Sequence, residues 1–507
     1  MNLRLILGDQ LNLNHSWFCD DNKNDFFVLI EAKSETNYVK HHIQKVVGIF
    51  SAMRQFAEKL KSNNFKVIYI DINHKNNKGS IEANLIELFN SNKYDKVIFQ
   101  EPDEIRLENN IVKYLEINNI DYKIDSSEHF YTERYFVKSF FKNKKTYLME
   151  SFYREMRKKH NILIENGEPT GGKWNYDQSN RKKYTGKDKL PKAFPIKNNV
   201  TEVLKDIEKA KIKTIGKIDS ENFHWTTNRN QALKILDHFC NECLPFFGDY
   251  QDAMIEEDNF LFHSRLSFAL NIKLISPKEV IDKVIEVGQK NKVDISQIEG
   301  FVRQIIGWRE FMRGIYWAEM PEYATLNFFN NQAKLPDYFW TGNTKMNCIK
   351  HAVSQSLDDA YAHHIQRLMI TGNFALLAGI NPDEVDNWYL GIYIDAFQWV
   401  EITNTRGMSQ FADGGKLATK PYVSSANYIN KMSNYCKKCH YDFKKKVGNK
   451  ACPFNSLYWN FFNTHENKLR KNPRIGMAYM NLDKMNELDK NEILSQAKLY
   501  LENLESL

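Results

Sequence analysis

The sequence predicts two unlike parts: an N-terminal α/β domain built on a doubly wound parallel sheet, followed by an all-α domain. Three observations predict this fold class. Short apolar runs alternate with helical patterns over the first 130 residues, a stretch rich in Gly, Pro and basic residues follows, and from about residue 226 the pattern is helical. With 507 residues, 42% of them hydrophobic, the chain is long enough for separate cores. We therefore assign residues 1–132 to the α/β domain, 133–225 to a connector and 226–507 to the all-α domain.

Four strands and one clear helix are predicted in the α/β domain. The predicted strands are Leu3–Leu7, Phe26–Glu31, Lys66–Asp71 and Lys96–Gln100. The helix lies between the second and third strands, where apolar residues repeat at helical spacing at Ile49, Met53, Phe56 and Leu60. Ligands of such sheets bind beyond the carboxyl ends of the strands, where Gly8-Asp9-Gln10 and the segment from Glu31 to Tyr38 lie. The sequence here lacks the glycine-rich dinucleotide fingerprint, which excludes an ordinary NAD-binding domain.

The connector is identified by its composition, and the all-α domain by its apolar stripes. Gly171-Gly172, Pro191, Pro195 and the basic run Arg181-Lys182-Lys183 belong to the connector. Apolar residues from Ile298 to Trp308 recur at roughly helical spacing. The sequence contains no internal repeat, so a solenoid is not expected.

Positive charge is concentrated near the C-terminus. The segment from Lys431 to Arg474 has eleven Lys/Arg against two Asp/Glu, whereas the net charge of the whole chain is only +7. This concentration favours a surface for a polyanion such as nucleic acid, although a solvated lysine-rich face gives the same pattern. No apolar run is long enough for a membrane span, and the apolar start of the chain is too short for a signal sequence. We expect a cytoplasmic protein.

The seven cysteines suggest a metal centre. Cys436-x-x-Cys439, followed by Cys452-Pro453, is typical of thiolates that converge on a metal ion or an iron–sulfur cluster. The fourth ligand must come from elsewhere, and Cys348, Cys240 and Cys243 are candidates. Cys240-x-x-Cys243 paired with Cys436-x-x-Cys439 would make a four-cysteine zinc site, but the first pair lies in an apolar helical pattern that suits buried free thiols. Spacing alone therefore leaves an iron–sulfur cluster, zinc and no metal as alternatives.

Several motifs together resemble the photolyase/cryptochrome family. They match its iron–sulfur bacterial branch, the group of prokaryotic (6-4) photolyases, over nearly the whole chain. The motifs are Leu7-Gly8-Asp9-Gln10-Leu11, Gly171-Gly172-Lys173-Trp174-Asn175-Tyr176-Asp177, Gly307-Trp308-Arg309-Glu310-Phe311, Tyr361-Ala362-His363-His364-Ile365-Gln366-Arg367, Asn387-Trp388-Tyr389, Asp395-Ala396-Phe397-Gln398-Trp399 and Pro421-Tyr422-Val423-Ser424-Ser425. Any one of these motifs is weak, and together they are specific.

The resemblance implies an α/β antenna domain, a helical FAD-binding domain and a [4Fe–4S] cluster. The cluster ligands that it implies are Cys348, Cys436, Cys439 and Cys452, with Cys240 and Cys243 as structural residues. The residues implied for the FAD site are Ser264, Leu266, Ser267, Trp308, Arg309, Asp395 and Glu401. Glu401 matches the family residue that faces the flavin N5, and hydroxyls with free helix amides suit a diphosphate.

The family's chemistry is light-driven electron transfer from reduced flavin to a DNA lesion. A (6-4) photoproduct also needs a proton, and His364 matches the family's proton donor, with His363 beside it. Met408, Tyr422 and Tyr428 are expected to flank the lesion. One departure from eukaryotic (6-4) enzymes is Leu368 in place of a further histidine, which the iron–sulfur branch shares. The residues that match the family's route for reducing the flavin are Trp388, Tyr389 and Trp340.

The antenna domain is expected to hold 6,7-dimethyl-8-ribityllumazine, as in this branch. The predicted contacts are Gly8, Asp9, Gln10 and Glu35. We thus expect a monomer that repairs (6-4) photoproducts in UV-damaged DNA. Two alternatives remain open: a cryptochrome, which has the same cofactors but serves as a light receptor, and a zinc-containing nucleic-acid-binding module without photochemistry. The colour of the purified protein separates the second alternative from the family, because flavin and cluster both absorb visible light.

Overall fold

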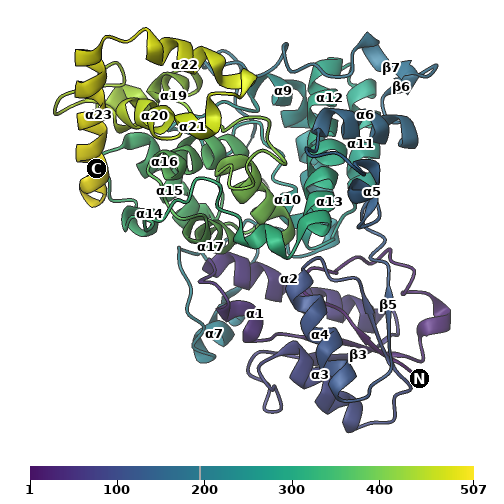
Figure 1. Ribbon diagram of the computed structural model, residues 1–507. Coiled ribbons are helices and arrows are strands. Elements are labelled where there is room, and N and C mark those ends of the chain that lie inside the picture. Colours follow the sequence, from purple (N-terminus) through teal and green to yellow (C-terminus); the bar gives the residue numbers. More distant parts are fainter. Residues whose placement is uncertain (193–195) are drawn as a thin grey trace.

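A computed structural model describes residues 1–192 and 196–507 of the chain. Pro195, which we assigned to the connector, lies outside the described residues. In Figure 1 the sheet domain lies below a larger helical part, and helix α2 runs along the boundary between them. None of the helices in the described ranges combines the length and apolar character needed to cross a bilayer.

The sheet domain contains five parallel strands in the order β3-β2-β1-β4-β5. The strands are β1 (Leu3–Leu5), β2 (Phe26–Ile30), β3 (Lys66–Ile70), β4 (Val97–Gln100) and β5 (Tyr122–Asp125). This confirms the predicted doubly wound sheet, because the order reverses at β1. The fifth strand was not predicted. It is a partly exposed edge strand with the sequence Tyr-Lys-Ile-Asp, so it lacks the apolar run that marks the central strands.

Helices cover both faces of this sheet, as expected when parallel strands are joined by crossovers. They are α1 (Ser34–Asn37), α2 (Ile43–Ser62), α3 (Ile81–Asn90) and α4 (Ile105–Ile117). The predicted helix corresponds to α2, whose Met53, Phe56 and Leu60 are buried. The N-terminus of α2 faces the helical part, since the His42 amide donates to the Gly391 carbonyl at 2.8 Å.

The segment between the two parts contains short elements. They are α5 (Phe136–Phe140), α6 (Met149–His160), the hairpin β6 (Ile164–Glu165) and β7 (Glu168–Pro169), η2 (Thr170–Gly172) and α7 (Thr201–Lys209). Helices α5 and α6 pack on the helical part, whereas α7 packs on α2 of the sheet domain. The segment therefore contacts both parts.

Every named element in residues 226–507 is a helix, which confirms the predicted class of the second part. Its first half comprises α8 (Arg229–His238), η3 (Phe239–Cys243), η4 (Leu244–Phe246), α9 (Phe247–Tyr250), α10 (Ser267–Asn271), α11 (Pro277–Lys290), α12 (Ile295–Val302), η5 (Arg303–Arg309), α13 (Glu310–Glu319), η6 (Glu322–Thr325), α14 (Tyr338–Thr341) and α15 (Asn347–Asp359). Its second half comprises η7 (Gln366–Gly372), α16 (Asn373–Leu377), α17 (Pro382–Ile392), α18 (Gln398–Ile402), η8 (Thr403–Ser409), α19 (Ala426–Met432), η9 (Tyr435–Lys438), α20 (Pro453–Thr464), α21 (Glu466–Leu469), η10 (Pro473–Ile475), α22 (Gly476–Asp483), α23 (Glu487–Glu502) and η11 (Leu504–Ser506).

Candidate active-site cavity

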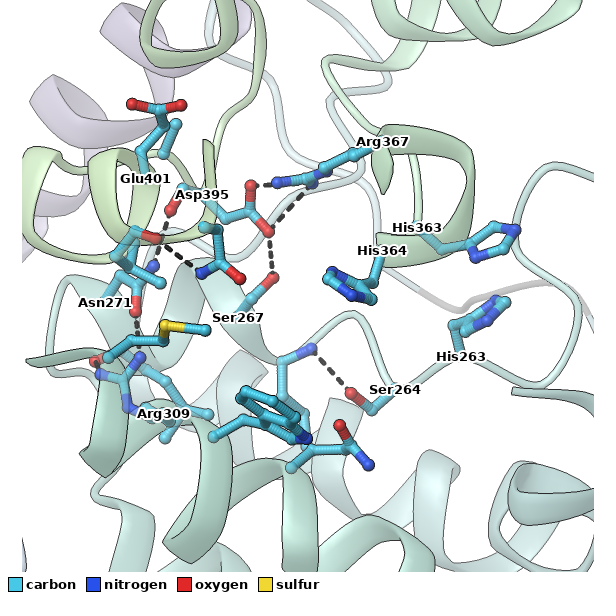
Figure 2. Close-up of a pocket in the computed structure, with 18 of the residues that line it drawn as sticks. His263, Ser264, Ser267, Asn271, Arg309, His363, His364, Arg367, Asp395 and Glu401 are labelled. Carbon is cyan, nitrogen blue, oxygen red and sulfur yellow. Dashed lines mark hydrogen bonds and ion pairs between the residues drawn. The ribbon is translucent and has the colours of Figure 1, made fainter. Parts of the chain in front are cut away.

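A cavity of about 320 Å³ opens inside the helical part. Segments from four regions of the chain meet around it, and Figure 2 shows ten of its side chains labelled. The predicted site residues that line it are Ser264, Leu266, Ser267, Trp308, Arg309, His363, His364, Tyr389, Asp395 and Glu401. The structure therefore brings together the seven residues predicted for the flavin site and both histidines.

Three stretches of π-helix form much of the cavity wall. They are η5, η7 and η8, which contribute Trp308 and Arg309, Arg367 and Leu368, and Thr405 and Ser409 respectively. A π-helical turn widens the helix by one residue, so its side chains point differently from those of a regular helix. Such turns are frequent at functional sites, and three of them around one cavity mark it as specialised.

Asp395 is the centre of a hydrogen-bond network on one side of the cavity. Its carboxylate accepts the Ser267 hydroxyl at 2.6 Å and lies 3.0 Å from the guanidinium of Arg367. Its backbone carbonyl accepts the side-chain amide of Asn271 at 2.6 Å. Figure 2 shows these contacts as dashed lines. Because the helical segments α10 and η7 both bind Asp395, the loop before α18 is held in one position.

Arg309 is a buried cation with one N–H group that has no hydrogen-bond acceptor in the described part of the chain. It donates to the side-chain carbonyl of Asn271 and, at 3.2 Å, to the backbone carbonyl of Leu270. Its Nε has no hydrogen-bond partner within the described residues. Burial lowers the pKa of Arg309 to about 10, so the group stays charged at neutral pH. A buried charge with a free donor suits a polar or anionic ligand in the cavity.

Glu401 places a buried carboxyl group in the same wall. The Thr405 hydroxyl donates to it. Burial, followed by the negative charge of Asp386, raises the pKa of Glu401 well above its usual value. The raised pKa favours the protonated form of Glu401, in which a carboxylic acid can donate a hydrogen bond to an acceptor in the cavity.

The two histidines occupy the opposite side of the cavity from Glu401 (Figure 2). The ring of His363 is stacked on that of His263, with centroids 4.3 Å apart, and neither of its ring nitrogens has a hydrogen-bond partner in the described part of the chain. The cavity walls enclose His364, and this desolvation, ahead of the charges of Arg367 and Arg181, lowers its pKa. Taken as a whole residue, His364 is nevertheless solvent-accessible, so approaching negative charge can favour its protonated form.

Four cysteines surround a second, very small cavity. Cys348 of α15, Cys436 and Cys439 around η9, and Cys452 before α20 all line it. Burial, together with the three other thiols, raises the pKa of Cys348 well above its usual value. Cys240 and Cys243 lie apart from them, buried in η3. No group of three or more His, Cys, Asp or Glu in residues 1–192 and 196–507 is arranged to hold a single metal ion.

Comparison with known proteins identifies the family. A family profile described as "Deoxyribodipyrimidine photo-lyase-related protein" matches residues 4–225. A (6-4) photolyase of Agrobacterium fabrum is 41% identical over 506 residues, which cover 99% of each chain. The chain belongs to the photolyase/cryptochrome family. This confirms the resemblance that the motifs predicted.

Solved structures of photolyases share the fold of this family member. A class III photolyase of Agrobacterium tumefaciens superposes with a TM-score of 0.56 at 14% identity, over 96% of this chain and 98% of the other. An archaeal photolyase of Sulfolobus tokodaii, solved with two FAD molecules, gives 0.52 at 15% identity, over 98% and 100% of the two chains. At such low identity these similarities establish the fold alone.

A third cavity of about 470 Å³ lies beside the first, with Trp308 in the wall of both. Met408 and Tyr422 line it, so these two predicted residues come together on one side of Trp308. Arg154 and Arg474 lie on its rim and are exposed. Tyr428 is half-buried and lines neither cavity, so the structure does not place it with the other two.

Of the three residues predicted for the electron route, Tyr389 and Trp388 have rings that lie side by side. Tyr389 lines the first cavity, and its ring lies 5.3 Å from that of Trp388, which is buried. The indole N–H of Trp388 donates to the backbone carbonyl of Phe339 at 2.9 Å. The next residue in the chain, Trp340, is 38% exposed, so it is accessible to an external reductant.

The sheet domain also has a cavity, with a volume of about 100 Å³. It lies beyond the carboxyl ends of β1, β2 and β4. Gly8, Asp9 and Glu35 line it. Burial raises the pKa of Asp9 to about 7. Gln10 does not line the cavity. Its side chain is fully buried and instead bonds to backbone groups, with its carbonyl accepting the Leu7 amide and its NH₂ donating to the Gln100 carbonyl.

Among the cavity residues that the sequence analysis did not select are His263, Asn271 and Arg367. His263 adjoins the predicted Ser264 turn, and Arg367 is part of the quoted His-His-Ile-Gln-Arg motif, so each stood beside a residue that was selected. The sequence around Asn271 contains no motif that marks it as a site residue, because its hydrogen-bond partner, Asp395, lies 124 positions later in the chain.

Proposed function

We propose that this chain is a (6-4) photolyase, which repairs (6-4) pyrimidine–pyrimidone photoproducts in UV-damaged DNA by using light. The observation that carries the proposal is the cavity that joins the Asp395 network, Glu401 and His364, in a chain that matches a (6-4) photolyase over its full length. We assign the flavin function to residues 226–507 and the antenna function to residues 1–132, joined by the connector 133–225.

The residues around the cavity fit FAD. Ser264, Leu266 and Ser267 lie in the turn that leads into α10, where the Leu266 amide donates to the Ser264 hydroxyl and the Ser267 hydroxyl donates to Asp395. A turn of hydroxyls and backbone amides at a helix start suits a diphosphate. The unpaired Nε of Arg309 offers a donor, and Glu401 in its protonated form would offer another toward N5. Trp308 supplies an aromatic wall. Bound and fully reduced, FAD would supply the electron that excitation by light transfers to the lesion.

His364 is the proton donor in this proposal. An imidazole whose pKa lies below neutral is a strong acid once it is protonated, and the phosphates of bound DNA favour that protonated form. His363 supports it from the neighbouring position, where its stacking on His263 orients the peptide between the two histidines. The lesion would enter from the side of Met408 and Tyr422, with Tyr428 beyond them, because aromatic faces stack on an extruded base.

We assign a [4Fe–4S] cluster to Cys348, Cys436, Cys439 and Cys452. Their convergence on one apolar cavity supports this assignment. A four-iron cluster binds one thiolate at each iron, so its ligands stand further apart than the ligands of one zinc ion. The lack of a single-ion site in the described residues therefore does not count against a cluster. Each thiol must lose its proton on ligation, because a metal centre reverses the effect of burial.

The remaining assignments follow the same logic. Trp340, Trp388 and Tyr389 would carry electrons from the surface to the flavin. The small cavity of the sheet domain would hold 6,7-dimethyl-8-ribityllumazine, with Gly8, Asp9 and Glu35 in contact and Gln10 supporting the loop from behind. We expect the protein to act as a cytoplasmic monomer.

Light-dependent repair of defined oligonucleotides tests the proposal. The purified protein is incubated with duplexes that carry one (6-4) photoproduct or one cyclobutane dimer, under blue light and in the dark. We expect repair of the (6-4) duplex in the light only, and much slower repair of the cyclobutane duplex. A protein that contains reducible FAD yet repairs neither lesion would support the cryptochrome instead, and a colourless protein that contains zinc would support the nucleic-acid-binding module.

A further inference from the structure

One stretch of chain contributes to the walls of both cavities and is called the shared wall here. Asp395 and Ala396 line the larger cavity, and the next residue, Phe397, lines the smaller one. The segment enters α18, which also carries Glu401. Any shift of this segment therefore changes both cavities at once.

Each part of the molecule holds one side of this wall. From the helical part, Ser267 and Asn271 bind the side chain and backbone of Asp395. From the sheet domain, the carboxylate of Glu104 accepts the Gln398 amide at 3.0 Å. Glu104 lines the smaller cavity, so a ligand there lies against a side chain that holds the wall.

Lys45 of α2 makes the most direct of these contacts. Its ammonium donates to the Ala396 carbonyl at 2.5 Å and to the Leu390 carbonyl at 3.0 Å, and it lies 5.4 Å from the centre of the Phe397 ring. Lys45 itself lines the smaller cavity. The Lys45 side chain thus bonds to the end of α17 and to the wall, and the residue also lines the smaller cavity.

The charge of Lys45 is unusual because it is buried without an ion pair. The side chain is 4% exposed, and no carboxylate lies within 4 Å of its ammonium among residues 1–192 and 196–507. Burial lowers the pKa of Lys45 to about 8, and the acids that oppose this come from both cavities: Glu104 on one side, Asp395 and Glu401 on the other. Burying an unpaired ammonium is unfavourable, so its retention in this position points to a role other than packing.

We propose that Lys45 is a positioning residue shared by the two cavities, and that filling the smaller cavity strengthens flavin binding in the larger one through it. This inference rests on the proposed function for the assignment of FAD to the larger cavity. A ligand beside Lys45, Glu104 and Phe397 restricts the wall, and a wall already restricted binds FAD with less loss of freedom. The coupling is reciprocal, so FAD must strengthen binding in the smaller cavity by the same factor.

The Lys45→Met variant tests the inference on the purified holoprotein, in the dark and without DNA. The measured quantity is the rate of FAD release on dilution, with and without excess 6,7-dimethyl-8-ribityllumazine. In the unmodified protein we expect lumazine to slow FAD release about fivefold, which is within the usual range of coupling between sites. In Lys45→Met we expect release to be about tenfold faster, as for loss of a charged hydrogen bond, and lumazine to have no effect.

Lys59→Met is the matched control, because Lys59 is an exposed lysine on the same helix. It should behave as the unmodified protein does. Lys45→Met should still fold, because Lys273 ties the two parts together independently: its ammonium donates to Asp103 at 2.5 Å and to the Asp9 carbonyl at 2.8 Å. Two results would overturn the inference. One is that Lys45→Met releases FAD at the same rate as the unmodified protein. The other is that lumazine still slows FAD release in Lys45→Met.

Hydrogen exchange of the unmodified holoprotein gives a second test that needs no variant. Lumazine should slow amide exchange in peptides that cover residues 390–398. If lumazine leaves both this exchange and FAD release unchanged, there is no coupling. Neither measurement involves repair, so the two hypotheses can fail separately. If the protein repairs DNA but its cavities are not coupled, only this inference is wrong. If the cavities are coupled but the protein does not repair DNA, only the proposed function is wrong.

Discussion

The larger cavity of the helical part and the smaller cavity of the sheet domain are built in opposite ways. The larger cavity collects side chains from residues 247 to 409, and its polar groups are already joined in the Ser267–Asp395–Arg367 and Asn271–Arg309 contacts. The smaller cavity is formed mainly by the loops after three parallel strands and is rich in charge, with Asp9, Glu35 and Glu104 in its wall.

Under the proposed function, this difference would separate the repair chemistry in the larger cavity from light capture in the smaller one. In the larger cavity His364 and Glu401 lie in the same wall as this network, and in the proposed reaction each supplies a proton or a hydrogen bond, so a single substitution should remove a step. Under the proposed function, a ligand in the smaller cavity adds absorbance and tightens flavin binding through Lys45, whereas the electron transfer itself starts from the flavin. Changes in the helical part should therefore abolish function, and changes in the sheet domain should only reduce it.

The largest effect is expected for His364→Ala. It should lower the rate of (6-4) repair by roughly 10²–10⁴-fold, because general acid catalysis is lost. FAD content, iron content and photoreduction should stay unchanged, and DNA binding should weaken only modestly, because phosphate contacts dominate affinity. His363→Ala provides the comparison and should lose less. Full repair by His364→Ala would assign the proton to another group, such as Tyr422.

The same variant gives a pH test. Since the pKa of His364 lies below its usual value, the protonated fraction rises as the pH falls. Repair by the unmodified protein should accordingly become faster from pH 8 to pH 6, measured under single-turnover illumination. The residual repair of His364→Ala should not follow this trend. A pH-independent rate in the unmodified protein would contradict His364 as the proton donor.

Replacement of a cluster cysteine should also have a severe effect within the helical part. Cys436→Ser is expected to lose iron and solubility together, because ligation of a metal centre is coupled to folding. The matched control is the double variant Cys240→Ser/Cys243→Ser, which changes a second Cys-x-x-Cys pair and should keep its iron. Iron content is measured per protein monomer. Loss of iron in the control would show that the wrong cysteines have been assigned.

A smaller effect is expected from neutralising the basic run Lys444, Lys445 and Lys446. All three lysines are exposed, and none lines a described cavity. Their conversion to Gln should weaken binding to damaged and undamaged DNA alike, and flatten the salt dependence by up to about 0.9 log units per lost phosphate contact.

The matched control removes three exposed lysines of the sheet domain, Lys59, Lys61 and Lys66. It should leave the salt dependence as it is. If DNA binding depends on salt concentration equally in the unmodified protein and in the Lys444–446 variant, these three lysines do not contact phosphates and form only a solvated surface.

The smallest effect is expected for Asp9→Asn in the sheet domain. Burial already keeps the pKa of Asp9 near 7, so part of the population is neutral and amide-like at physiological pH. We expect less than about a tenfold loss of lumazine binding, as for one hydrogen bond. Repair driven by light that the flavin itself absorbs should be unchanged. Loss of repair under that light would contradict the division between the two cavities.

The sequence by itself determined the order and type of the elements. Strand and helix periodicity report the burial of near neighbours, so β1 to β4 and helix α2 were predictable from local pattern. The partly exposed β5 was not, because an edge strand lacks the continuous apolar run on which such a prediction depends. The motifs around His364 and Asp395 likewise selected residues that the structure brings into one cavity, although their roles stay predictions.

Only the tertiary structure decided which of these residues meet. Cys240-x-x-Cys243 and Cys436-x-x-Cys439 have the same spacing, yet the first pair is buried in η3 and the second joins Cys348 and Cys452 around one cavity. Gln10 lies in the predicted loop but points to backbone groups, and Lys45 carries no signal of its contact with Ala396, 351 positions away. The physical reason is that spacing along the chain constrains only neighbours, whereas the partner of a ligand, a buried charge or a hydrogen bond is chosen by how distant segments pack.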